Sequence, residues 1–116
     1  MTVRTLTERR QAEAARRAAA VAMLCRELAA AAGGFGGRYL LYGSAARGEL
    51  RHDSDVDLLL DFPDAGGRTA AWTFAEDCCA ALGLLCDIRP IEMCDAGFLA
   101  HVLPEAKALA EAKVLG

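Results

Sequence analysis

Two aspartates spaced two residues apart are the first feature of this sequence that could do chemistry. Asp55 and Asp57 open the run Asp-Val-Asp-Leu-Leu-Leu over residues 55–60. In a β-strand, residues two apart point to the same face, so both carboxylates would stand side by side. Ionised carboxylates this close repel each other, and a hard cation such as Mg²⁺ relieves that repulsion. The pattern indicates a metal site, although an edge strand with one solvated face would show the same alternation.

A glycine-bounded turn precedes these aspartates. Residues 43–48 read Gly-Ser-Ala-Ala-Arg-Gly and follow an apolar run. Gly43 would let the backbone approach an anion closely, and Ser44 adds a hydroxyl. If the turn opens a helix, its first N–H groups favour an anion, and the guanidinium of Arg47 matches a phosphate. The alternative is an ordinary turn with a surface arginine, so the segment indicates phosphate binding only together with the aspartates.

Asp87 is a third carboxylate in an unusual place. It lies between Cys86 and Ile88 in a short apolar run that predicts a strand. A carboxylate there needs a partner or a function. If this strand lies beside the strand of Asp55 and Asp57, the three aspartates form a triad. Pairing with Arg89 at a sheet edge is the alternative, and the sequence leaves both open.

Together, the three segments resemble the nucleotidyltransferase superfamily of the DNA polymerase β type. The motifs Gly-Ser-x-x-Arg-Gly and Ser-Asp-x-Asp-Leu carry the resemblance, which runs from Tyr39 to Ile88, close to half of the chain. The compact length resembles the minimal nucleotidyltransferase (MNT) domains of bacteria and archaea. The resemblance implies an α/β (α+β) fold like the palm of polymerase β, in which helices flank a small mixed β-sheet.

The resemblance implies a metal-dependent enzyme. Asp55 and Asp57 would ligate two Mg²⁺ ions. Asp87 would complete the site of the ion that activates an acceptor hydroxyl. Phosphoryl transfer needs positioning and charge neutralisation more than a protein nucleophile, and a two-metal clamp supplies both.

The resemblance also implies a nucleotide substrate. Gly43 and Ser44 would hold the β- and γ-phosphates of ATP or another nucleoside triphosphate, and Arg47 would support the loop or the phosphates. The reaction would transfer a nucleoside monophosphate, AMP in the case of ATP, to a hydroxyl group.

The partner expected from the resemblance is another protein. Larger relatives carry a second domain for the acceptor, and we expect none within these 116 residues. Such domains are paired with helical HEPN proteins, often as antitoxin and toxin, and some add AMP to the partner. The alternative is an antitoxin that acts by contact alone, with a weak or silent nucleotide site. The sequence leaves the base preference and a homo-oligomeric state open.

Hydrophobic spacing predicts the elements that position these residues. Thr5-Leu6-Thr7-Glu8 has the spacing of a capping box, and a helix to about Ala32 follows, with one apolar face. The other expected elements are strands over 38–42, 55–62 and 84–88, a helix over 68–82, and a tail over 95–115 with a break at Pro104. The alanines favour helix over a short strand after that break. We expect one domain, 1–116, made of an N-terminal helix and glycine-rich loop (1–37), a catalytic core (38–90) and a C-terminal segment (91–116).

Composition narrows the class of protein. Hydrophobic residues make up 54% and charged residues 25%, which excludes intrinsic disorder. We expect no membrane span, because no run of about 18 apolar residues occurs, and no secretory signal, and therefore a cytoplasmic protein. The five cysteines form no C-x-x-C pair, so buried free thiols are expected. The net charge of −3 argues against nucleic acid as a partner.

Charge is unevenly distributed along the chain. Residues 1–52 hold nine arginines and four glutamates, whereas residues 53–116 hold four basic and twelve acidic residues. The acidic half contains all three candidate aspartates. Some of its carboxylates are therefore expected to hold cations rather than only to face water.

Overall fold

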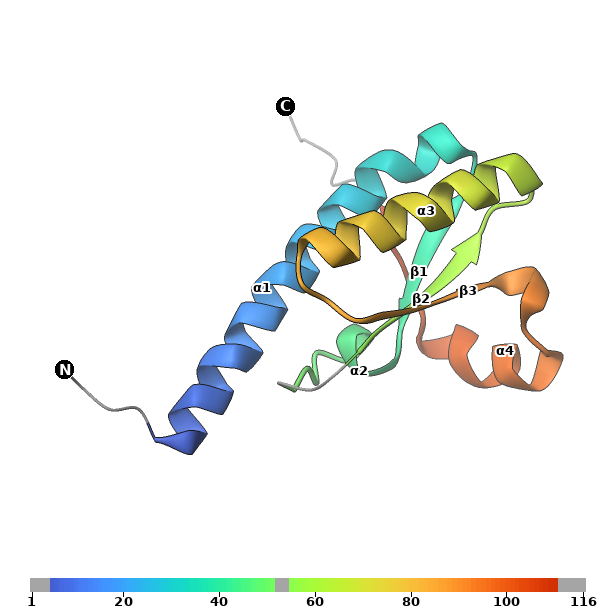
Figure 1. Ribbon diagram of the computed structural model, residues 1–116. Coiled ribbons are helices and arrows are strands. Elements are labelled where there is room, and N and C mark those ends of the chain that lie inside the picture. The colour runs from blue at the N-terminus through green and yellow to red at the C-terminus, as the bar shows by residue number, and fades with distance from the viewer. Residues whose placement is uncertain (1–4, 52–54, 111–116) are drawn as a thin grey trace, which may run out of the picture.

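The computed structural model describes residues 5–51 and 55–110 and has helices packed on a four-stranded sheet (Figure 1). The main elements are α1 (Leu6–Ala32), β1 (Arg38–Tyr42), α2 (Gly43–Ala46), β2 (Val56–Asp61), α3 (Ala65–Ala81), β3 (Cys86–Pro90), α4 (Ala96–Val102) and β4 (Lys107–Ala108). Single 3₁₀ turns lie at Gly33–Phe35, Ile91–Met93 and Leu103–Glu105. This order confirms the expected α/β class with a mixed sheet.

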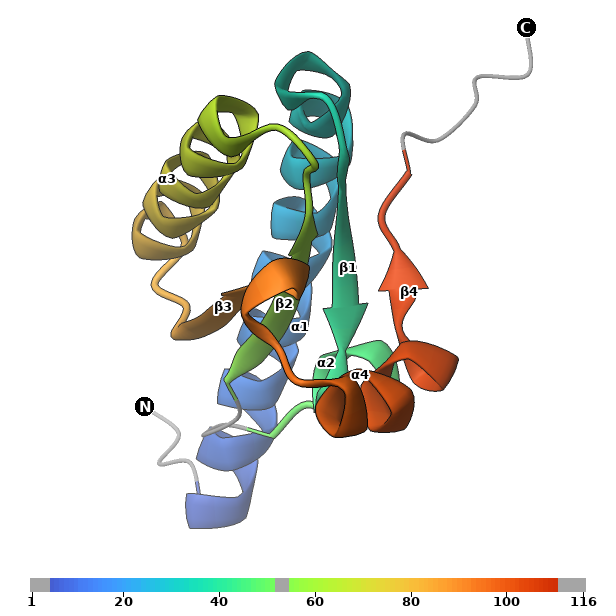
Figure 2. The same cartoon turned by 90° about the vertical axis from the view of Figure 1, so that its right-hand side faces the viewer.

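The sheet has the strand order β3-β2-β1-β4. Strand β1 pairs antiparallel with β2, and β2 pairs parallel with β3. Helices α1 and α3 pack on one face of the sheet, and α4 packs on the other face near its lower end (Figure 2). The strands alternate accordingly. On β2, Val56, Leu58 and Leu60 belong to the core under α1 and α3, whereas Leu59 belongs to the smaller core under α4.

Helix α1 begins and packs as its sequence predicts. The Thr5 hydroxyl accepts from the Glu8 backbone N–H at 3.1 Å, and the Glu8 carboxylate accepts from the Thr5 N–H at 3.3 Å. This reciprocal capping box satisfies two N–H groups that a helix start leaves without partners. The buried residues of α1 are those of the predicted face: Val21, Leu24, Leu28 and Ala32. The N-terminal half of α1 runs past the sheet (Figure 1).

The segment Leu6–Phe35 is long and apolar enough to cross a membrane by length and composition, although charged residues interrupt its apolar stretches. Helices in protein cores and signal sequences meet the same criterion. In this structure the C-terminal half of α1 packs against the sheet and α3. The absence of a membrane span stays a prediction.

Strand β2 and the end of α3 differ from their predicted bounds by one residue at each end concerned, and three elements differ by more. Helix α3 begins at Ala65 rather than 68, because the Asp64 carboxylate caps it by accepting from the Gly67 N–H at 2.9 Å. Strand β3 spans Cys86–Pro90 rather than 84–88, in register with Val56–Leu60 of β2. After Pro104 the chain forms the short strand β4 rather than a helix, because β1 offers it a sheet edge. The expected tail beyond residue 110 lies outside the described residues.

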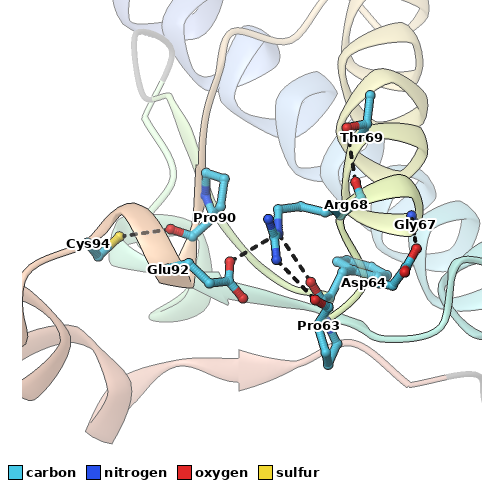
Figure 3. Close-up of polar contacts among 10 residues, drawn as sticks. Pro63, Asp64, Gly67, Arg68, Thr69, Pro90, Glu92 and Cys94 are labelled. Atoms are coloured by element: carbon cyan, nitrogen blue, oxygen red, sulfur yellow. Dashed lines mark hydrogen bonds and ion pairs between the residues drawn. The ribbon is translucent and has the colours of Figure 1, made fainter.

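One contact ties the start of α3 to the turn after β3. The Arg68 guanidinium donates to the carbonyls of Phe62 and Pro63, each at 3.2 Å, and pairs with Glu92 at 3.1 Å (Figure 3). These bonds satisfy carbonyls at the end of β2 and link two loops that lie far apart in the sequence. The loop after β2 is thereby fixed at the end of the sheet opposite α2.

The expectation of free thiols is wrong for two cysteines. Cys79 at the end of α3 and Cys86 at the start of β3 form a disulfide, with a Cα–Cα distance of 6.5 Å. The turn at Gly83 brings them within the range that a disulfide spans. The other three, Cys25, Cys78 and Cys94, are free.

Packing of α1 on the sheet can be tested by a matched pair of leucine-to-alanine substitutions. Leu28→Ala should lower the free energy of unfolding by about 2–5 kcal/mol, because the Leu28 side chain is fully buried in the core. Leu85→Ala removes the same atoms from a residue that is 67% exposed, and should change it by less than about 0.5 kcal/mol. Urea denaturation followed by circular dichroism measures both. Equal losses would contradict the packing described here.

Candidate functional site

The predicted aspartates Asp57 and Asp87 lie on the sheet face that α1 and α3 leave open. Sheet register pairs Tyr42 of β1 with Asp57 of β2, and Asp57 with Asp87 of β3. These three side chains therefore form a row across three adjacent strands, here called the acidic row. Asp55 lies just before β2, two residues from Asp57 and on the same alternation. The structure thus brings Asp57 and Asp87 together, which is the strand pairing on which the proposed triad depended.

The carboxylate of Asp57 has a perturbed pKa. Burial raises its pKa, and the neighbouring carboxylates of Asp87 and Asp55 raise it further. The guanidinium groups of Arg89 and Arg47 oppose this shift. Asp57 therefore lies in excess negative charge, which a bound cation would neutralise.

The predicted turn forms a single helical turn, α2, that begins at Gly43. Gly43 has φ +73°, a conformation that L side chains rarely adopt, and a Cβ there would overlap the Oδ2 atom of Asp57. The backbone of the turn therefore packs directly against the carboxylate. Ser44 follows within α2, half-buried, and its carbonyl accepts from the Glu49 N–H at 2.9 Å. The turn and the acidic row form one continuous site.

Arg47 ends α2 and faces two glutamates. Its Nε lies 3.1 Å from Glu49, and its Nη1 lies 3.3 Å from Glu105 in the turn after α4. The hydrogen bond to Glu49 raises the pKa of Arg47 most, so the group stays charged. These ion pairs link Arg47 to the segment after α2 and to the turn after α4, and the loop-supporting role stays a prediction. A phosphate contact stays a prediction.

The carboxylate of Asp87 lies beside Asp57 and also has the arginine partner that the sequence offered as the alternative. Arg89 Nε donates to Asp87 Oδ1 at 3.3 Å and Oδ2 at 3.1 Å, and Nη2 lies 3.0 Å from Oδ2. The guanidinium also lies 5.0 Å from the centroid of the Phe98 ring of α4. That ring meets Tyr42 edge-on at 5.8 Å between centroids. The carboxylates of Asp57 and Asp87 are thus flanked by a cation and two aromatic rings.

Sequence reasoning missed Tyr42 and Phe98 as members of the site. Burial, with Asp57 and Asp87 nearby, raises the pKa of Tyr42 to about 12, so the phenol keeps its proton at neutral pH. Its position directly before Gly43 was the available signal for Tyr42. For Phe98 no signal existed, because its contact with Arg89 depends on how α4 folds back over the sheet.

The donor set of the acidic row fits Mg²⁺. Asp55, Asp57 and Asp87 offer hard carboxylate oxygens, the ligands that Mg²⁺ prefers. As they stand in residues 5–51 and 55–110, no three His, Cys, Asp or Glu side chains are grouped closely enough to hold one metal ion. Both oxygens of Asp87 are hydrogen-bonded to Arg89, and metal binding by all three carboxylates requires side chains to turn toward one another.

Two glycine substitutions test the close approach of the turn to Asp57. Gly83→Ala should lower the free energy of unfolding by about 1 kcal/mol, because φ is +68° but the space for a Cβ is open. Gly43→Ala adds an overlap with Asp57 to the same backbone strain and should cost more. Thermal and urea unfolding of the two variants measures the difference. A loss at Gly43 no larger than that at Gly83 would show that the carboxylate moves aside freely.

A second prediction concerns the charge of Asp57 in metal-free protein. Because folding raises its pKa, its stabilising contribution is present below the pKa of the unfolded chain and is lost as pH rises through the folded value. Ionised Asp57 therefore destabilises the domain at neutral pH. Asp57→Asn should raise Tm slightly at pH 7 in the presence of a chelator, and the gain should shrink as the pH falls toward 4.

Asp61→Asn is the matched control, since Asp61 lies on the same strand and pairs with Arg38 at 2.8 Å. Its Tm should not rise at pH 7, because the substitution removes a favourable ion pair. Scanning fluorimetry across the pH range measures both variants. A lower Tm for Asp57→Asn than for wild type would mean that this carboxylate has a structural role.

A family model described as a nucleotidyltransferase domain matches residues 24–108. Among curated proteins none matches the chain. The matched span runs from the second half of α1 to β4 and contains the whole acidic row and the turn at Gly43. Because this span covers most of the chain and holds the predicted motifs on the predicted elements, the chain belongs to the nucleotidyltransferase domain family, in the DNA polymerase β-like superfamily.

Proposed function

We propose that this protein is a Mg²⁺-dependent nucleotidyltransferase that transfers AMP from ATP to a hydroxyl group. Family membership supports transferase chemistry in general. The observation that carries the specific proposal is the acidic row, in which Asp57 and Asp87 are register partners directly beside the glycine turn. Carboxylates held this close need positive charge nearby to offset their repulsion. The backbone of the glycine turn beside them would allow the phosphates of a Mg²⁺-bound nucleotide to approach closely.

The residues of the site have distinct roles in this proposal. Asp55 and Asp57 would hold the metal ions next to the triphosphate, and Asp87 would ligate on the side of the acceptor. Gly43 and Ser44 would receive the β- and γ-phosphates. When bound, the ions would neutralise charge on the phosphates and favour the deprotonated acceptor oxygen. That oxygen forms a bond to the α-phosphorus, the bond to the β-phosphate oxygen breaks, and pyrophosphate leaves.

The acceptor in this proposal is a hydroxyl group of a HEPN-type helical protein, and the pair would form a cytoplasmic toxin–antitoxin system. In the described part of the chain, two short helices lie beside the acidic row, the four-residue α2 and the seven-residue α4. These helices offer little surface to orient an acceptor. Positioning contributes roughly 7–11 kcal/mol to such reactions, so a partner that brings its own hydroxyl into line supplies what this domain lacks.

A second candidate function is that of an antitoxin that acts by contact alone. The observation that favours it is the state of Asp87, whose two oxygens are hydrogen-bonded to Arg89. If this arrangement were permanent, the metal site would be incomplete and the domain would bind its partner without transferring a nucleotide.

One experiment separates the two candidates. The protein is incubated with ATP and Mg²⁺, with and without the product of the neighbouring gene, and intact masses are measured. We expect one or more AMP units on the partner, and a loss of at least about 100-fold in rate for Asp55→Ala. Asp61→Asn, on the same strand, should keep near wild-type activity because Asp61 pairs with Arg38 away from the acidic row.

Binding of nucleotide should be visible in the same preparations. Mg²⁺ with ATP should raise Tm more than ATP alone, because a ligand that binds only the folded state stabilises it. Tight complex formation with no mass change in either protein would overturn the transferase and favour contact alone. No Mg²⁺-dependent shift at millimolar ATP would overturn the nucleotide site itself.

A further inference from the structure

The guanidinium of Arg89 contacts both oxygens of the Asp87 carboxylate. Three distances of 3.0–3.3 Å join its guanidinium to the two oxygens of Asp87. By comparison, Arg38 reaches Asp61 on the same face of the sheet through Nε at 2.8 Å. Both pairs are exposed to water, with Arg89 at 48% and Asp87 at 41% side-chain exposure. Exposed pairs of this kind are weak enough to open.

The guanidinium of Arg89 has a second contact that does not depend on Asp87. It lies over the face of the Phe98 ring at 5.0 Å, and Phe98 is held in turn by its edge-on contact with Tyr42. A cation on an aromatic face is stabilised by the ring quadrupole. If the Asp87 carboxylate turned away, Arg89 would therefore keep a defined resting place on α4.

Arg89 also acts on the charge balance of the whole row. Its guanidinium pairs with Asp87, which is the register partner of Asp57, so its positive charge lies close to both carboxylates. In metal-free protein, Arg89 therefore does electrostatically what a cation does in the loaded site. A divalent ion and Arg89 would compete for the same two oxygens of Asp87.

We infer that Arg89 is a positioning residue that serves as the internal counter-ion of Asp87, and that a metal ion must displace it before Asp87 can act as a ligand. The inference rests on the proposed function and adds a reason for the state of Asp87 in metal-free protein. Displacement moves no covalent bond and no proton. The Asp87 carboxylate exchanges one positive partner for another, and Arg89 remains on Phe98.

The test measures metal affinity without nucleotide, so it does not depend on activity. Mn²⁺ is titrated into full-length protein, and the free ion is followed by electron paramagnetic resonance. Arg89→Gln should lower the Kd for Mn²⁺ about three- to tenfold, because the competitor is gone. Arg38→Gln removes an equal charge from the same face and should change the Kd less than about twofold. Arg89→Lys, with a single ammonium in place of the fork, should give an intermediate Kd.

The decisive control repeats Arg89→Gln in a protein that lacks the Asp87 carboxylate. In an Asp87→Asn background, Arg89→Gln should no longer tighten Mn²⁺ binding, because there is no carboxylate left to release. A purely structural role of Arg89 would lower Tm without producing this dependence on Asp87. Should Arg89→Gln fail to fold, the Arg89→Lys variant alone must still bind Mn²⁺ more tightly than wild type.

Each remaining outcome has a definite meaning. An equal effect of Arg89→Gln and Arg38→Gln, an effect that persists with Asn at position 87, or weaker binding in Arg89→Gln would each overturn the counter-ion role. In all three cases, Mn²⁺ binding that is lost in Asp57→Asn would leave the proposed function standing. Absence of Mn²⁺ binding from wild type and every variant would overturn both.

Discussion

The parallel pairing of β2 with β3 places Asp57 and Asp87 at neighbouring positions, and the rest of the site is organised around that constraint. Backbone hydrogen bonds fix the two strands about 4.8 Å apart, so the carboxylates cannot move away by more than their own rotamers allow. Partial burial makes the repulsion costly, as the raised pKa of Asp57 shows. Positive charge from Arg89 and Arg47 and an open side toward water offset it without removing it.

The stability that tolerates this repulsion comes from the opposite face of the sheet. Strand β2 turns Val56, Leu58 and Leu60 toward α1 and α3, where each is fully buried. Close packing there depends on glycine where elements meet, as at Gly37, where a Cβ would overlap the Asp61 carbonyl, and at Gly67, where it would overlap the Phe35 carbonyl. One face of the domain therefore supplies cohesion and the other carries chemistry, and the period-two alternation of a single strand divides the two.

Local signals in the sequence were enough to predict α1, β1 and the shared face of Asp55 and Asp57. The capping box at Thr5 and the Asp-x-Asp alternation each involve only a few neighbouring residues, so they can be recognised in the sequence without knowledge of the fold. The position of β3 and the strand after Pro104 were missed because neighbouring strands determine them through pairing. The contact of Arg89 with Phe98 was beyond reach for the same reason, since it joins β3 to a helix on the other side of a turn.

The ion pair between Arg89 and Asp87 has opposite meanings under the two proposed functions. In a contact-only subunit it would be a permanent way to neutralise a carboxylate beside Asp57. An exposed pair contributes only about 0–1 kcal/mol, however, and a surface that needed no metal would lose little by lacking both charges. In a transferase the same weakness is useful, because the pair balances the row in metal-free protein and yields to a divalent ion. The contact of Arg89 with Phe98 favours the transferase, because the guanidinium would still be stabilised by the ring after it has left Asp87.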